Sequence, residues 1–363
     1  MVTATNETIL VRAGEELDLS ALDNYLQHQL AEQVSDFPAG STIQVEQFPG
    51  GHSNLTYLIR YGTHEFVLRR PPVGPVAATA HDMPREYKLL SVINPRFSLA
   101  PKPILLCEDA SVIGVPFYLM EKRNGLIVRS SLPAEFNENL ELRRRLSESA
   151  VNTLVALHAV NIYGSGIVNI GKPDGFVGRQ VHGWADRWLR SKTEEIPEME
   201  EVIAWLTARI PSEKTNKATI VHNDFKLDNL MLDATDAASI VAVLDWEMCT
   251  VGDPLIDLGL FLTYWTMKGG NQQSTLRAVT NGPGWMTREE IIEQYQAMTG
   301  RDVSQIVFYE TFANFKVAVV VQQIYFRYAR GQTRDERFRQ LDSLVKELIR
   351  SAHASARVRD SEL

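Results

Sequence analysis

The residues best suited to chemistry lie in one short polar stretch and at the end of a later apolar run. His222, Asp224 and Asn229 have the spacing His-x-Asp-x₄-Asn, and Asp245 follows four apolar residues. Phosphoryl transfer needs a carboxylate that orients the attacking hydroxyl, oxygen ligands for Mg²⁺ and cations around the phosphates. We therefore expect Asp224 to accept the hydroxyl proton and Lys226 to bring positive charge to the transferred group. Asn229 and Asp245 would bind Mg²⁺, because this ion prefers hard oxygen ligands.

The competing interpretation is that these residues are loop polar groups that cap two strand ends. Residues around them favour the chemical reading. We expect His222 to brace the loop and Asp257 to accept hydrogen bonds from the loop backbone. Asp253, followed by Pro254, is typical of a helix start, with Asp as the N-cap and Pro in the first turn. Glu247 keeps two open roles, as a contact of a second metal or a water, or as a support for the ligands.

A glycine-containing segment lies earlier in the chain, between two strand-like runs. Gly50, Gly51, Ser53 and Asn54 follow one another closely there. Glycines let the backbone approach phosphates, and backbone amides and a hydroxyl can donate to them. We expect this segment to bind the phosphates of ATP. The alternative is a Gly-Gly hairpin turn with no ligand.

Two adjacent arginines end the strand-like run that follows. A cation on this strand would hold the α- and β-phosphates and pair with a helix glutamate. Strand alternation sends Arg69 and Arg70 to opposite faces, and we prefer Arg69 because Val67 shares its face and can pack on a base. Glu86 is its expected partner. The alternatives are a solvated basic strand end and an exposed helical glutamate.

A third nucleotide-binding element is expected where an apolar strand runs into a polar linker. The backbone of Glu121, Lys122 and Arg123 would hydrogen-bond the adenine edge of ATP. An ordinary edge strand is the alternative interpretation. The Asn124-Gly125 turn directly after this linker predicts the boundary between two lobes. We expect a nucleotide-binding N-lobe over 1–121 and a C-lobe over 122–363 that carries the catalytic loop, the metal site and a helical substrate subdomain.

The elements that must position these residues change character along the chain. After a frayed start over 1–16, a capping box at Ser20 predicts a helix. Short strands and one helix follow, at 43–48, 56–61, 65–70, 85–93 (the helix), 104–107 and 116–121. Beyond about residue 134 helical spacing dominates, with helices expected near 142–158, 182–191, 198–209, 254–267, 287–298, 305–330 and 333–355. Only two strand-like runs interrupt them, at 230–232 and 240–244, on either side of a tight turn at 233–238.

Bulk composition excludes several classes of protein. The chain has 363 residues, a net charge of −8 and 44% hydrophobic residues. An acidic protein is a poor general binder of nucleic acid, because phosphate contacts need a basic surface. Two cysteines, Cys107 and Cys249, provide no disulfide framework or metal-ligand spacing. We therefore expect a cytoplasmic protein without a membrane span; the sequence does not set its oligomeric state.

Several ordered motifs resemble the aminoglycoside phosphotransferase family. They are Gly-Gly-x-Ser-Asn-x-Thr-Tyr at 50–57, Val-Leu-Arg at 67–69, Ala-Leu-His at 156–158, His-x-Asp-x₄-Asn at 222–229, Leu-Asp-Trp-Glu at 244–247 and Gly-Asp-Pro-x-x-Asp at 252–257. Within the family, residues 68–72 and 245–254 look most similar to the kinase domains of acyl-CoA dehydrogenase family members 10 and 11. The resemblance implies an α+β, two-lobed protein-kinase-like fold, with a small β-rich N-lobe and a larger, mostly helical C-lobe. It departs at Arg69, where many family members have Lys.

By this resemblance, Asp224 is the catalytic base, Asn229 and Asp245 bind Mg²⁺, and ATP is held by Ser53, Arg69 and the 121–123 linker. The chain would be an ATP- and Mg²⁺-dependent small-molecule kinase, and the similar branch implies a hydroxyacyl-CoA-type acceptor. A protein kinase is disfavoured, because too few residues separate Asp245 from Asp253 for a long activation loop.

Three alternatives stay open at this point. One is an aminoglycoside acceptor, which needs several carboxylates around the pocket. Another is a choline- or sugar-type acceptor, and the last is a nucleotide-binding module without turnover. An acyl-CoA needs cations instead, and the stretch Arg327, Arg330, Arg334, Arg337, Arg339 is one candidate source. A solvated helix face is the competing reading of that stretch.

Overall fold

The computed structural model describes residues 7–49, 54–72, 82–129, 131–164, 166–212, 216–266, 279–333 and 336–360. The chain divides into two compact units, each of which we describe by itself. The first unit comprises residues 1–125 and 241–247, and the second comprises 126–240 and 248–363. The functions assigned to an N-lobe over 1–121 and a C-lobe over 122–363 stay a prediction.

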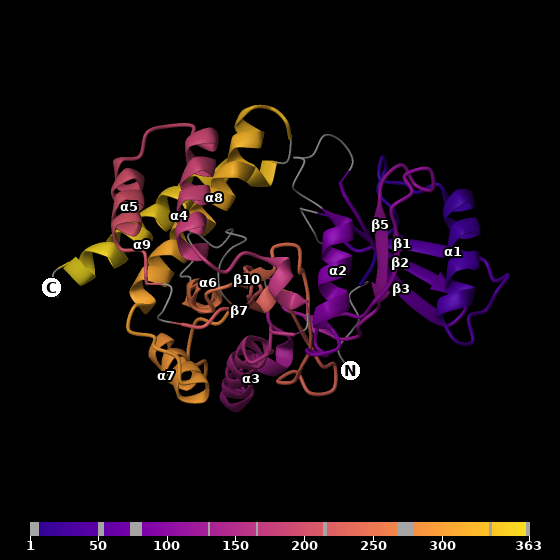
Figure 1. Ribbon diagram of the computed structural model, residues 1–363, viewed down its shortest axis with the longest axis horizontal. Coiled ribbons are helices and arrows are strands. Elements are labelled where there is room, and N and C mark those ends of the chain that lie inside the picture. The colour runs from indigo at the N-terminus through magenta and orange to yellow at the C-terminus, as the bar shows by residue number, and fades with distance from the viewer. Residues whose placement is uncertain are drawn as a thin grey trace. The chain divides into compact units, whose positions relative to one another are not determined.

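The first unit is built on a five-stranded antiparallel sheet of order β1-β2-β3-β5-β4 (Figure 1). Its strands are β1 (Gln44–Gln47), β2 (Leu55–Tyr61), β3 (His64–Arg70), β4 (Pro103–Cys107) and β5 (Phe117–Glu121). Helices α1 (Leu19–Gln33) and α2 (Met83–Ile93) lie on opposite sides of this sheet. All the predicted strands and the helix at 85–93 are therefore present, with shifts of a few residues at their ends.

Alternation along β2 decides which side chains enter the core. Leu55, Tyr57, Ile59 and Tyr61 are buried in one apolar cluster, which also contains Leu22, Leu26 and Leu30 of α1. These three leucines recur at helical spacing, so one stripe of α1 covers one face of the sheet. The N-cap of α1 is Asp18, whose carboxylate accepts from the amide of Ala21 at 3.0 Å. The capping box predicted at Ser20 is wrong, because the better N-cap residue lies two positions earlier.

The expectation that residues 1–16 are frayed is wrong for residues 7–16. Ile9 forms a backbone bridge with Gln47 of β1, with both N–H···O distances at 2.8 Å. The carbonyl of Glu15 accepts from Tyr57 Oη at 2.6 Å and from Arg70 Nη2 at 2.8 Å. This segment is held by residues distant in the sequence, so its local composition gives no sign of the order.

The second unit is mostly helical (Figure 1). Its α-helices are α3 (Leu140–His158), α4 (Phe176–Ser191), α5 (Pro197–Ala208), α6 (Leu255–Thr266), α7 (Arg288–Thr299), α8 (Ile306–Ala329) and α9 (Leu341–Asp360). Helix α8 packs against α4, α6 and α9, and the predicted buried run at 317–321 lies in it. Among the described helices none is long and apolar enough to cross a membrane.

Short strands carry the loops of interest. They are β6 (Leu126–Ile127), β7 (Thr219–Val221), β8 (Leu230–Leu232), β9 (Ile240–Val243) and β10 (Thr250–Gly252), with β6 paired to β8 and β7 paired to β10. The expectation of only two strand-like runs beyond residue 134 is wrong, since β7 and β10 are also present and are too short for periodicity to reveal. The predicted turn at 233–238 is present: the amide of Asp233 donates to the carbonyl of Ser239 at 2.8 Å.

Candidate functional site

The catalytic-loop candidates lie in the second unit, between β7 and β8. The carboxylate of Asp224 accepts from Lys226 Nζ at 2.9 and 3.0 Å and from Asn229 Nδ2 at 2.9 Å. The same amide nitrogen of Asn229 donates to the carbonyl of Asp224 at 2.8 Å. Two of the predicted site residues, Lys226 and Asn229, therefore converge on the carboxylate of a third, Asp224, whose side chain is 20% exposed. A fixed and partly exposed carboxylate can accept a proton from a hydroxyl placed beside it.

Lys226 keeps its charge in this setting. Its ammonium lies 5.0 Å from the ring centroid of Tyr264 on α6. Burial by itself lowers the pKa of Lys226, but Tyr264 and Asp224 beside it raise that pKa above its ordinary value. Burial in turn raises the pKa of Tyr264 to about 12. Lys226 is therefore a cation at neutral pH, within reach of any negative charge next to Asp224.

The backbone of the loop is held by Asp257, which is fully buried in the first turn of α6. Its two oxygens accept from the amides of His222 at 2.6 Å and Asn223 at 2.7 Å, so the predicted role of Asp257 is confirmed. His222 Nδ1 accepts from the amide of Asp224 at 3.3 Å, which is the bracing predicted for it. Asn223 adopts a left-handed backbone with φ 65°. This turns the chain directly before Asp224, while the amides of His222 and Asn223 both donate to Asp257.

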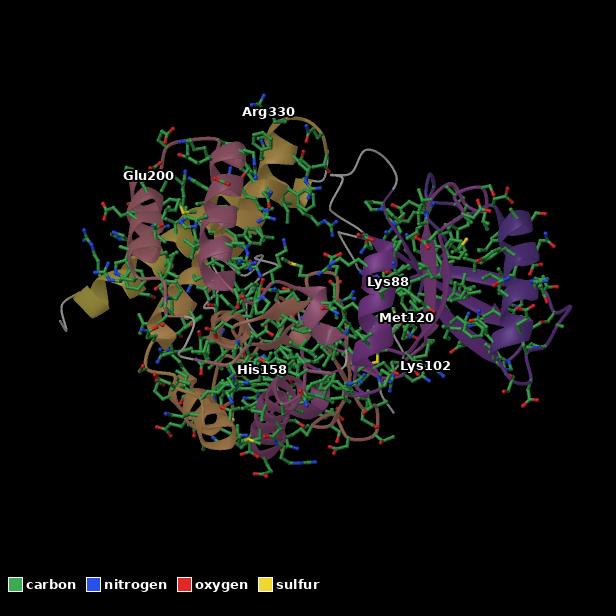
Figure 2. The ribbon with its side chains drawn as sticks, in the orientation of Figure 1. Lys88, Lys102, Met120, His158, Glu200 and Arg330 are labelled. Carbon is green, nitrogen blue, oxygen red and sulfur yellow. The ribbon has the colours of Figure 1, made fainter. Side chains whose placement is uncertain are left out.

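Behind Asp257 lies a buried pair of residues from two other helices. His158 of α3 places Nε2 3.3 Å from Asp257 Oδ2 and Nδ1 2.8 Å from the hydroxyl of Tyr295 on α7. His158 lies in the interior of the second unit (Figure 2) and is 3% exposed. Burial lowers its pKa, and Asp257 opposes this shift only in part. A neutral imidazole therefore orients the carboxylate that holds the loop.

Sequence reasoning missed one residue of this region, Lys316 of α8. Its ammonium donates to the carbonyl of Asn223 at 2.6 Å. A lysine just before an apolar helical run gives no sign that it is buried, because lysines are almost never fully buried unless paired. Asp253 was read correctly as a helix start: Oδ1 accepts from the amide of Leu255 at 2.9 Å.

The predicted cation and metal-binding carboxylate lie in the first unit. Arg69 of β3 places its guanidinium 3.2 Å from Glu86 of α2, 3.1 Å from Asp245 and 3.9 Å from Glu247. Burial alone lowers the pKa of Arg69, but these carboxylates raise that pKa well above its ordinary value. The predicted Arg69–Glu86 ion pair is present, and Arg70 points to the other face, where it bonds the hydroxyl of Tyr57.

The chain around Asp245 is tied to the first unit on both sides. Val243 N donates to the carbonyl of Leu99 at 2.8 Å, and Glu247 accepts from Asn54 Nδ2 at 2.8 Å. The backbone of Asp245 is left-handed, with φ 66°. Asn54, predicted at the phosphates, thus bonds Glu247, which agrees with a supporting role for that glutamate. Gly50, Gly51 and Ser53 lie outside the described residues.

The three residues of the predicted adenine linker, Glu121, Lys122 and Arg123, differ in whether their backbone amides are hydrogen-bonded. The amide of Glu121 donates to the carbonyl of Lys102 at 2.9 Å, so it is occupied by sheet pairing. Within the described ranges no residue hydrogen-bonds the amides of Lys122 and Arg123, which suits backbone recognition of a base. The Lys122 side chain is 9% exposed and pairs with Glu7 and Glu65, both at 3.2 Å. This side chain therefore helps to fix the N-terminal segment.

The predicted metal ligands fit Mg²⁺ by the chemistry of their donor atoms. The NH₂ group of Asn229 makes both of its hydrogen bonds to Asp224, so its amide oxygen accepts none from the part of the chain that is described. That oxygen and the carboxylate of Asp245 are hard donors of the type Mg²⁺ takes. The described residues contain no cluster of three or more His, Cys, Asp or Glu side chains that could hold a metal. Each of these two residues therefore offers an oxygen of the kind that Mg²⁺ takes beside phosphate oxygens and water.

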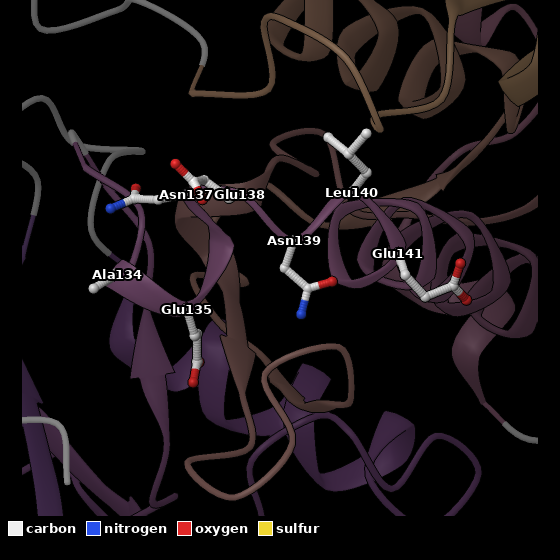
Figure 3. Close-up of a pocket in the computed structure, with 7 residues that line it drawn as sticks. All are labelled: Ala134, Glu135, Asn137, Glu138, Asn139, Leu140 and Glu141. Atoms are coloured by element: carbon white, nitrogen blue, oxygen red, sulfur yellow. The ribbon is translucent and has the colours of Figure 1, made fainter.

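Two other surface features contain none of the predicted catalytic or nucleotide-binding residues. Four arginines in the last turn of α8 and the stretch that follows it are exposed: Arg327, Arg330, Arg337 and Arg339. Their exposure agrees with a solvated face, and Arg334 lies outside the described residues. An open pocket of about 720 Å³ is lined by residues 134, 135 and 137–141 (Figure 3). Its acidic side chains, Glu135, Glu138 and Glu141, point in different directions and so converge on no single ion.

The sequence of this chain is similar to those of known proteins. The profile of the phosphotransferase enzyme family matches residues 44–291. Acyl-CoA dehydrogenase family member 11 of Rattus norvegicus is 33% identical over 339 residues, which are 92% of this chain and 42% of that protein. Family member 10 of Mus musculus is 32% identical over 353 residues, which are 94% of this chain and 31% of that protein. The chain therefore spans less than half the length of these relatives.

Known structures extend the similarity to the fold. A Ralstonia eutropha protein assigned to the aminoglycoside phosphotransferases is 28% identical, with a TM-score of 0.80 over 94% of this chain and 99% of that one. Choline kinase from Cryptosporidium parvum has a TM-score of 0.59 at 13% identity, covering 91% of this chain and 97% of that one. The ADP and hygromycin B complex of aminoglycoside phosphotransferase APH(4)-Ia has a TM-score of 0.56 at 14% identity, covering 92% and 98%. Both show the fold alone, and the expected kinase-like α+β fold is confirmed. The chain therefore belongs to the phosphotransferase enzyme family.

Proposed function

We propose that this protein transfers the γ-phosphate of ATP, with Mg²⁺, to a hydroxyl of a small molecule, and that Asp224 accepts the hydroxyl proton. One observation carries the proposal. The Asp224 carboxylate is held by Lys226 and Asn229, while Asp257 fixes the amides of the two preceding residues. A carboxylate oriented in this way lowers the barrier chiefly by positioning the hydroxyl, which is most of what phosphoryl transfer requires from a protein.

The remaining residues have distinct roles in this proposal. Lys226 places positive charge on the phosphoryl group as it moves away from ADP. Arg69 and the backbone of Lys122 and Arg123 hold ATP, and Gly50, Gly51, Ser53 and Asn54 complete the phosphate contacts. Asn229 and Asp245 hold Mg²⁺, which when bound neutralises negative charge on the phosphate oxygens. The ADP complex of a related fold supports a nucleotide as the donor.

The charges near Asp224 support an anionic acceptor rather than a polycationic one. Lys226 pairs with Asp224 at 2.9 Å, and Lys316 interacts electrostatically with Asp224, with Lys226 and with Arg187. An aminoglycoside carries several ammonium groups and is better held by carboxylates. The similarity to acyl-CoA dehydrogenase family members 10 and 11 supports an acyl-CoA that carries a hydroxyl group. We therefore place hydroxyacyl-CoA-type acceptors first and choline or sugar alcohols after them.

The assignment of Asp224 is tested with Asp224→Asn. We expect kcat to fall at least 100-fold, because general-base positioning contributes about 10²–10⁴-fold. The affinity for ATP, measured by calorimetry, should stay within about threefold. Asp302→Asn is the matched control, since Asp302 is an exposed aspartate whose carboxylate accepts from the amide of Ser304 at 2.9 Å. Unchanged turnover in Asp224→Asn would sink the assignment, and ATP binding without turnover in the unmodified protein would favour a nucleotide-binding module.

The acceptor is tested by following ADP release with hydroxyacyl-CoAs, aminoglycosides, choline and sugar alcohols. We expect hydroxyacyl-CoAs to raise ADP release and to yield a phosphorylated acceptor detectable by mass spectrometry. A response to an aminoglycoside alone would reverse the proposed order of acceptors while leaving the phosphotransferase assignment intact.

A further inference from the structure

Helix α8 carries a charged residue in a mostly apolar buried face. Lys316 is 3% exposed, and its neighbours Phe312, Phe315 and Val319 are buried. A lysine buried this deeply needs a partner, since removing an ammonium from water is strongly unfavourable. Among the described residues no carboxylate lies within ion-pair distance of Lys316.

The partners of Lys316 are a carbonyl and an aromatic ring. Its Nζ lies 2.6 Å from the carbonyl oxygen of Asn223 and 3.5 Å from Oδ1 of the same residue. The ammonium also lies 5.5 Å from the ring centroid of Trp184 on α4, a cation–π distance. Among the described residues, the hydrogen bonds of this buried cation are therefore directed at the residue immediately before Asp224.

Asn223 is held in a backbone conformation that non-glycine residues seldom adopt. Its φ is 65°, it is 4% exposed, and its amide donates to Asp257. Its side-chain Nδ2 donates to the carbonyl of Met248 at 3.1 Å. Lys316 supplies the donor for the one remaining backbone group, the carbonyl, which belongs to the same peptide plane as the amide of Asp224.

We propose that Lys316 is a positioning residue of the catalytic loop, which fixes the peptide between Asn223 and Asp224 and so the direction of the Asp224 carboxylate. This inference rests on the proposed function of Asp224. Two helices act on the loop from separate directions: Asp257 of α6 holds amide groups, and Lys316 of α8 holds a carbonyl. Together they leave the peptide little freedom to rotate about the left-handed turn.

The ammonium should act only while it is charged. Burial lowers the pKa of Lys316 to about 8. The charged groups that face it are Asp224 and Lys226 from the loop, Asp257 from α6 and Arg187 from α4, and the two carboxylates favour its protonation. An uncharged amine is a weaker donor to a carbonyl than an ammonium, so the loop should loosen as the pH rises past this value.

The test is Lys316→Met, which keeps the length of the side chain and removes its charge and donors. We expect kcat to fall at least tenfold with KM for ATP changed less than twofold. Deuterium exchange of loop amides over 220–229 should become at least tenfold faster. The unmodified enzyme should lose turnover above about pH 8, and this limb of the pH profile should be absent in the variant.

Gln322→Met is the matched control, on the same helix. Gln322 is also 3% exposed, and its Nε2 donates to a backbone carbonyl, that of Ser191, at 2.7 Å. It makes no contact with the loop, so we expect normal kcat and normal loop exchange.

The outcomes separate two failures. If Asp224→Asn is inactive but Lys316→Met keeps both its kcat and its loop protection, the role of Lys316 is overturned. Equal loss of kcat and loop protection in Lys316→Met and Gln322→Met would also overturn it, since the effect would then be general to the helix. If Asp224→Asn is fully active, the proposed role of Asp224 is wrong, and the role of Lys316 that rests on it is overturned with it.

Discussion

Arg69 Nη2 lies 3.1 Å from Oδ1 of Asp245, so the cation expected at the nucleotide is paired with the carboxylate expected at the metal. The same guanidinium neutralises Glu86, which is 2% exposed. Arg69 therefore has a structural task besides any contact with phosphate. A forked, permanently charged guanidinium can face two carboxylates at once, which a lysine ammonium does less well.

Arg69→Met should destabilise the first unit strongly. Glu86 would remain buried without its countercharge, and removing one partner of a buried ion pair lowers the free energy of unfolding by about 3–5 kcal/mol. Urea unfolding followed by circular dichroism measures this loss. Arg60→Met is the control: Arg60 pairs with Glu46 and Glu65 on the same sheet but is 29% exposed, so its loss should be about 1 kcal/mol or less. Equal losses for the two variants would contradict the structural role of Arg69.

Asp257→Asn should uncouple the loop from α6. The amides of His222 and Asn223 bond different oxygens of Asp257, and an asparagine replaces one of these oxygens by an NH₂ group, which would face an amide donor. We expect kcat to fall about 100-fold, by analogy with the loss of about 2.7–4 kcal/mol seen when one preorganised hydrogen bond of an active site is removed. KM for ATP should change little, because no described nucleotide-binding residue contacts Asp257. A proportional rise in that KM would indicate a different role.

Acid should destabilise the second unit through His158. Burial holds the pKa of His158 below its ordinary value of 6.5. The unfolded chain therefore binds a proton that the folded chain does not, and stability falls as the pH drops below about 6.5. His158→Gln removes this titration, so the stability difference between the unmodified protein and the variant should shrink from pH 7 to pH 5. Urea unfolding at each pH checks this, with the exposed His182→Gln of α4 as the control. A difference that stays constant across this range would contradict the linkage.

Gly259→Ala should be destabilising although glycine is a poor helix former. A Cβ at this position of α6 would lie 2.6 Å from the backbone oxygen of Tyr309 on α8. Overpacking of this kind lowers stability by about 1–3 kcal/mol. Gly183→Ala on α4 is the matched control, since its nearest neighbour would be the mobile end of Arg187 at 3.6 Å, and replacing a helical glycine by alanine stabilises by up to about 1 kcal/mol. Thermal unfolding of the two variants should therefore shift in opposite directions.

Local patterns predicted most of the fold and part of the site. The strands of the first unit, the main helices and the Arg69–Glu86 pair follow from alternation, helical spacing and turn chemistry. The paired strands β7 and β10, each three residues long, carry too little periodicity to be recognised. Lys316 was missed for a different reason: its partner Asn223 lies 93 residues earlier in the chain, so only the packing of α8 brings them together.

The left-handed backbones of Asn223 and Asp245 have a consequence for how this sequence can evolve. Their φ angles are 65° and 66°, a region in which a side chain adds about 1–2 kcal/mol of strain that glycine avoids. Asparagine and aspartate are among the side chains that tolerate it best. Selection for stability alone would therefore drift toward glycine at both positions. Glycine at either position would relieve this backbone strain, but it would also remove the carboxylate of Asp245 or the side-chain amide of Asn223.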